Sequence, residues 1–115
     1  MGLFDFLKPK EKLDPSLLEA LNGKGFDGDV NEDGTFCLTA PDGVEYSAFL
    51  REKELTVRFK QPQPYKVLFS FKKDGHYVND PNPEGYRILI DSLKASRSTA
   101  GVQAAVYTFL LDRYK

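Results

Sequence analysis

The chain has 115 residues, of which 41% are hydrophobic and 29% are charged, and its net charge is −1. This composition is typical of one soluble globular domain and excludes a disordered chain, and no apolar run approaches the ~18 residues of a membrane-spanning helix. The single cysteine, Cys37, excludes an internal disulfide framework and indicates a reducing compartment, so we expect a cytoplasmic protein.

The N-terminus combines a short apolar segment with a polar tether. We therefore divide the chain into residues 1–12, the segment with its tether, and a single α+β domain, residues 13–115. The segment could fold back onto the domain, dock on a protein partner or touch a membrane surface weakly. The free energies of burying and of ordering it nearly cancel, so we expect it to serve partner binding more than stability. Its apolar residues, the first part of a possible partner surface, are Leu3, Phe4, Phe6 and Leu7.

A short helix should follow, because Asp14 is a good N-cap, Pro15 suits the first helical position and Asn22-Gly23 can end a helix. Between residues 26 and 71, five runs of alternating polarity are separated by turn signals, which predicts an antiparallel meander. In the fifth run, Val67 should share the core face with Phe69 and Phe71. Residues 76–78 could add a sixth strand.

Two helices should complete the chain. Apolar residues recur at helical spacing from Tyr86 to Leu93, which predicts a helix to about Ala95, although residues 86–91 could also form a strand. A second apolar stripe begins after a cap at Ser98 or Thr99. The predicted fold is α+β, with a meander of about five strands, a short N-terminal helix and two C-terminal helices packed on one face.

The charges are segregated along the chain. Residues 27–45 carry six acidic and no basic side chains, whereas residues 51–73 carry seven basic side chains against two acidic ones. Neighbouring strands could neutralise each other across the sheet, or the basic strands could form a surface for an acidic partner. The basic residues proposed for this partner surface are Arg51, Arg58, Lys60, Lys72 and Lys73.

Two other functions remain open. Aromatic and basic residues interleave in the basic strands, as in single-stranded nucleic-acid binding, but the alternation places Phe59 opposite to Arg58 and Lys60, so we consider nucleic acid unlikely. A pocket between sheet and helices could hold a small molecule or support a weak enzyme. Its candidate lining is Tyr46, Phe49, Tyr77 and Tyr86.

Residues with catalytic or metal-binding chemistry are few. The run from Asp29 to Phe36 is similar to half of a calcium loop, but Ala40 stands where the loop needs a bidentate Glu, so we predict a hairpin turn. His76 has no second ligand or nucleophile to work with, and Cys37 is expected to be a small buried apolar residue. We expect no catalysis, no metal and no cofactor. The sequence thus predicts a small protein-binding or adaptor domain, with a protein partner or a homo-oligomer.

Overall fold

In the part of the chain that the structure describes, six strands form one antiparallel sheet in which each strand pairs with the next one along the chain. The computed structural model describes residues 15–31, 33–51 and 54–115. The strands are β1 (Asp27–Val30), β2 (Phe36–Thr39), β3 (Glu45–Arg51), β4 (Glu54–Gln61), β5 (Lys66–Lys72) and β6 (Gly75–Val78). The helices are α2 (Pro15–Gly23), α3 (Arg87–Ala95) after the 3₁₀ turn η1 (Pro83–Tyr86), and α4 (Thr99–Arg113). The predicted α+β meander is confirmed, and β6 is its sixth strand.

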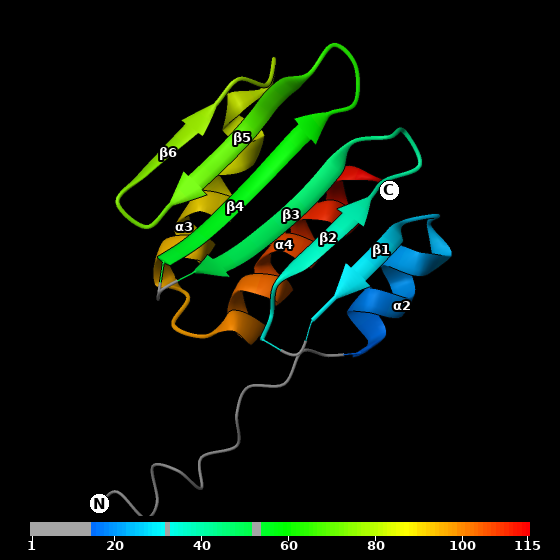
Figure 1. Cartoon of the computed structure of the whole chain (residues 1–115), viewed down its shortest axis with the longest axis horizontal. Helices are drawn as coiled ribbons and strands as arrows, with labels where there is room; N and C mark the ends of the chain where they lie inside the picture. The colour runs from blue at the N-terminus through cyan, green and yellow to red at the C-terminus, as the bar shows by residue number, and fades with distance from the viewer. Residues whose placement is uncertain (1–14, 32, 52–53) are drawn as a thin grey trace, which may run out of the picture.

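The helices cover one face of the sheet. In Figure 1 the helices α3 and α4 lie behind the sheet, α2 lies beside β1, and α4 contacts both of the other helices. The opposite face is turned toward the viewer, and none of the described elements covers it. We call this the open face, and the helix-covered one the inner face.

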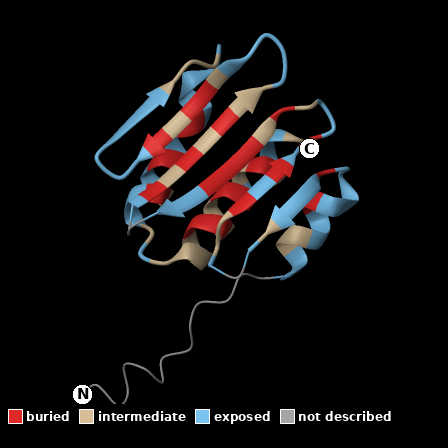
Figure 2. Cartoon of the chain, in the orientation of Figure 1, coloured by how far each residue is buried: buried red, intermediate tan, exposed pale blue. Residues whose placement is uncertain are grey.

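The core lies between the inner face and the helices. A row of ladder partners, Leu38, Tyr46, Phe59 and Phe69, runs across four strands, and each of these side chains is at most 1% exposed. The Tyr86 ring stacks on Phe69 at 4.9 Å between ring centroids. Figure 2 shows that buried residues gather in the central strands, whereas the edge strands β1 and β6 are mostly exposed. Burial of these large apolar rings is the main favourable term for folding.

The helix boundaries follow local signals in the sequence. Residues 87–95 form α3, so the alternative of a strand at residues 86–91 is wrong. Ser98 is the N-cap of α4, and its hydroxyl accepts a hydrogen bond from the Gly101 amide at 3.0 Å. The expected cap of the first helix, Asp14, lies outside the described residues.

The β1–β2 turn takes the hairpin form that the sequence predicts. Gly34 adopts φ = 91°, a conformation that other residues rarely adopt, and an added Cβ would lie 2.4 Å from the Thr99 side chain. Both the backbone conformation and the lack of space for a side chain therefore require glycine at this position. Asp33 accepts hydrogen bonds from the amide and hydroxyl of Thr35. The Gln103 side chain donates to the Gly34 carbonyl at 3.1 Å and ties the turn to α4.

Val67 and Leu68 of β5 lie on the opposite faces from those that simple alternation predicts. The β4–β5 register shifts between Phe59 and Lys60, so that Phe59 pairs with Phe69 while Lys60 pairs with Val67. This β-bulge inserts one extra residue into β5 and reverses the alternation beyond it. Val67 therefore shares the open face with Lys60, and Leu68 is buried.

Candidate functional site

The open face of the sheet is built from one residue in every two along each strand. Residues paired in a ladder share a face, so a row of paired residues can be followed from strand to strand across all six strands. The central row runs through Asp29, Cys37, Ser47, Arg58, Ser70 and Tyr77. Apart from Ser47, which is buried beneath its neighbours, these side chains are at least partly exposed.

Charge is divided between the two halves of the open face except in the end row, where Arg51 on β3 pairs with Glu54 on β4. Acidic side chains stand on the first three strands, with Asp27 and Asp29 on β1 and Glu45 on β3. Basic side chains stand on β4 and β5, including Lys60, which pairs with Glu45 in the ladder, and Lys72. No ion pair within 4.0 Å joins the two halves among the described residues. The sheet therefore brings opposite charges side by side only at its middle, and the outer charges keep no ionic partner within this part of the chain.

Exposed aromatic rings accompany the basic half. Tyr65 is 74% exposed and Tyr77 is 53% exposed, and the Lys60 ammonium lies 6.0 Å from the centroid of the Tyr65 ring. A shallow hollow of about 590 Å³ lies between them, lined by Arg58, Tyr65, Lys66, Val67, Ser70, Tyr77 and Asn79. The expectation that aromatic and basic side chains lie on opposite faces is correct for Phe59 but wrong for these two tyrosines, which come from a turn and an edge strand.

The predicted partner surface is only partly assembled. The ladder register places four of its basic residues on the open face: Arg51, Arg58, Lys60 and Lys72. Lys73 lies instead in the turn after β5, in a small hollow with Leu55 and Arg97 that reaches the start of α4. The four apolar residues of the N-terminal segment, Leu3, Phe4, Phe6 and Leu7, lie outside the described residues.

The structure does not bring the predicted pocket residues together. Tyr46 and Tyr86 are fully buried between the sheet and the helices. Phe49 and Tyr77 are about half exposed, at 49% and 53%, and belong to the open face on the other side of the sheet. Side chains that point to opposite faces of a sheet cannot line one cavity.

An apolar groove lies elsewhere, between α3 and α4. It has a volume of about 580 Å³, and its apolar lining includes Ile88, Ala105 and Phe109. Ile88 is 79% exposed, which is unusual for a large aliphatic side chain on a helix. Arg113 and Asp112 mark the end of the groove near the chain terminus.

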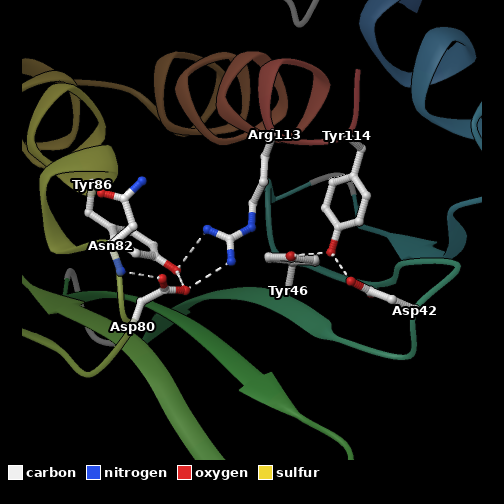
Figure 3. A network of polar contacts seen from close by, with 7 residues as sticks. All are labelled: Asp42, Tyr46, Asp80, Asn82, Tyr86, Arg113 and Tyr114. Atoms are coloured by element: carbon white, nitrogen blue, oxygen red, sulfur yellow. Dashed lines mark hydrogen bonds and ion pairs between the residues drawn. The ribbon is translucent and has the colours of Figure 1, made fainter.

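A polar cluster that the sequence did not reveal lies at the end of α4, beside the loop after β6 (Figure 3). The Asp80 carboxylate accepts hydrogen bonds from the Tyr86 hydroxyl at 2.8 Å, from Arg113 Nη2 at 2.9 Å and from the Asn82 amide at 2.9 Å. Burial favours the neutral acid, but these three donors outweigh it and lower the pKa of Asp80. Burial and the acceptor Asp80 raise the pKa of Tyr86 well above its usual value. This cluster fixes the last turn of α4 to the loop after β6.

A second chain of polar contacts holds the C-terminal residues against β3 (Figure 3). Tyr114 donates to the Asp42 carboxylate at 2.8 Å, so its oxygen accepts from the Tyr46 hydroxyl. Burial and the acceptor Asp42 raise the pKa of Tyr114. Both polar clusters satisfy buried hydroxyl groups at the rim of the core, which makes them structural supports of the fold.

The residues with reactive side chains are separated from one another. Cys37 is exposed on the open face, so its expected burial is wrong; partial desolvation, and then Glu45 and Asp29, raise the pKa of its thiol. A raised pKa leaves less of the nucleophilic thiolate. His76 is exposed on the edge strand β6, beside α3. Within the described ranges, no three His, Cys, Asp or Glu side chains form a group that could hold a metal ion.

Comparison of the chain with protein-family models, with curated proteins and with solved structures finds no match in any of the three. Among the helices that the structure describes, none is long and apolar enough to cross a membrane. The arguments for function therefore come from the surfaces of this molecule alone.

Proposed function

We propose that the chain is a small protein-binding domain that presents the open face of its sheet to a protein surface of matching charge pattern. The observation that carries this proposal is the combination of segregated charge and exposed aromatic rings on one uncovered sheet face. Tyr and Arg are enriched in protein interfaces, because they combine a large contact area with hydrogen-bonding groups. The lone cysteine is the argument for placing the domain in the cytoplasm.

The charge pattern sets the chemistry of the partner. A partner that offered only acidic groups would meet Arg58 and Lys60 favourably but would be repelled by Asp27 and Asp29. The same argument applies, in stronger form, to a nucleic acid, whose phosphates repeat along the whole strand. A protein surface that carries basic and acidic patches side by side fits both halves.

Lysine footprinting in an extract of the source cells tests this function. We expect Lys60 and Lys72, on the open face, to become less reactive toward an acylating reagent, while Lys94 on α3 keeps its reactivity. Protease treatment of the extract should abolish the protection, and nuclease treatment should leave it unchanged. Protection of Lys94 instead would assign the binding to the helices, and nuclease-sensitive protection would assign it to a nucleic acid; either result overturns the proposal.

A second candidate function is the binding of a small apolar molecule in the groove between α3 and α4. The volume of about 580 Å³ lies within the range of small-molecule sites, and the exposed Ile88 offers an apolar wall. An apolar ligand that raises the melting temperature of the wild type but not of Ala105→Trp, which fills the groove, would support this function. Equal shifts for both proteins would exclude it.

A further inference from the structure

The partner that fits the open face with the fewest assumptions is a second copy of the same chain. We propose that two copies pack open face to open face around a two-fold axis that runs parallel to the strands, between β3 and β4. This inference rests on the proposed function and names the partner of the same surface.

Charge selects this axis. In a two-fold dimer the same surface appears on both sides, so a face with one acidic and one basic half can complement itself. Rotation about an axis parallel to the strands places β1 of one copy over β6 of the other, β2 over β5 and β3 over β4. Glu45 on β3 then faces Lys60 on β4 of the other copy, and the acidic strand β1 lies over β6, whose open-face residues Gly75 and Tyr77 carry no charge. Rotation about an axis across the strands would place β1 over β1 in the opposite direction, so that the acidic pair Asp27 and Asp29 would face the same pair of the other copy.

The register gives the contacts of such a dimer. Glu45 of one copy lies over Lys60 of the other, because these two residues share a row on the adjacent strands β3 and β4. The two-fold axis makes this contact twice. In the central row, Cys37 on β2 lies over Ser70 on β5, and Asp29 on β1 lies over Tyr77 on β6.

The available area is sufficient for a weak dimer. Six strands spaced about 4.8 Å apart give a face about 29 Å wide, and the strands extend for about 15–20 Å. Each copy would then bury roughly 450–550 Å², or about 1,000 Å² in total, which is the lower limit for a specific interface. The exposed aromatic rings of Tyr77 and Phe49 supply apolar contact area within this face. We therefore expect a salt-sensitive dimer with a dissociation constant in the micromolar range.

Charge-reversal variants in sedimentation equilibrium test the arrangement. Glu45→Lys and Lys60→Glu should each weaken self-association about tenfold, because like charges then face each other twice across the interface. An equimolar mixture of the two variants should recover the affinity of the wild type to within about threefold, as a heterodimer. Mixing cannot repair a defect within one chain, so the mixture separates a contact between copies from the ladder contact of Glu45 and Lys60 inside each sheet. Lys94→Glu on α3 is the control with the same charge change and should associate like the wild type.

Cross-linking tests the register. A Ser70→Cys variant, which keeps Cys37, should yield a covalent dimer with a short bis-maleimide. Residues 37 and 70 of one chain stand three strands apart, about 14 Å, which exceeds the reach of such a reagent. The control Ile88→Cys, exposed on α3, should give no covalent dimer above background.

The outcomes separate this inference from the function on which it rests. A purified wild type that stays monomeric at about 100 μM, or a variant mixture that stays monomeric, overturns the dimer. If Lys60 is nevertheless protected by protein in the extract, the open face binds a different protein and the proposed function stands. If neither self-association nor protection occurs, both the dimer and the proposed function are wrong.

Discussion

Replacing Asp80 tests whether the polar cluster at the end of α4 stabilises the domain. The Asp80 side chain is 7% exposed and is the acceptor for both the Tyr86 hydroxyl and the Arg113 guanidinium. Asp80→Ala leaves the buried Tyr86 hydroxyl without its acceptor, which costs about 1–3 kcal/mol of stability. It also removes the hydrogen bond from the charged Arg113 side chain, which would contribute about 1.5–3 kcal/mol if it were fully buried. Because the Arg113 side chain is 33% exposed and water can solvate it, the second contribution shrinks. We expect a loss of about 2–4 kcal/mol in urea unfolding at pH 7.

The dependence on pH provides the control. Asp80→Asn keeps the shape and an acceptor oxygen but removes the charge, so it should cost less, about 1–2 kcal/mol at pH 7. The folded-state pKa of Asp80 is lowered, so its stabilising contribution is complete above the unfolded pKa of ~3.9 and is lost as the pH falls through the folded pKa. The difference between wild type and Asp80→Asn should therefore be constant from pH 7 to about 5 and shrink below that range. A difference that stays the same down to pH 2.5, or a variant as stable as the wild type at pH 7, would refute the argument.

Three further predictions concern other parts of the chain. The buried Tyr107 hydroxyl has no hydrogen-bond partner among the described residues, and burial raises its pKa to about 12, so Tyr107→Phe should leave stability unchanged or raise it by up to about 1 kcal/mol in thermal unfolding. The β1–β2 turn should bind calcium no more tightly than millimolar, since Ala40 replaces the bidentate Glu; micromolar binding by calorimetry that Asp33→Ala abolishes would contradict this. Deleting residues 1–8 should leave the melting temperature within a few degrees but weaken protein association, and unfolding of the truncated domain would instead make these residues part of the core.

The architecture could be predicted because its signals are local. Alternation along each run assigns inner and outer residues, and the turn residues between the runs fix neighbouring strands in antiparallel order. The placement of Arg58 and Lys60 on the face opposite to Phe59 followed from this alternation. The exposed position of Cys37 was equally available, since it alternates with Phe36 and Leu38, but the general tendency of cysteine to be buried led to the wrong expectation.

The site itself needed information that the sequence pattern does not carry. The row across the open face depends on the register of five strand pairs, and a single bulge moved Val67 onto that face. Tyr65 lies in a turn, where alternation makes no prediction, yet it borders the same hollow as Tyr77. The contact of Asp80 with Arg113 joins residues 33 positions apart, and no spacing in the chain marks them as partners.

The most direct test of the central claim is the ratio of acylation at Lys60 to acylation at Lys94, measured by mass spectrometry in the cell extract and in dilute purified protein. If the open face binds protein, the ratio should fall at least severalfold in the extract and return to the value of the dilute protein after protease treatment. A ratio that is the same in the extract and in dilute solution would contradict the assignment of the open face as the binding surface.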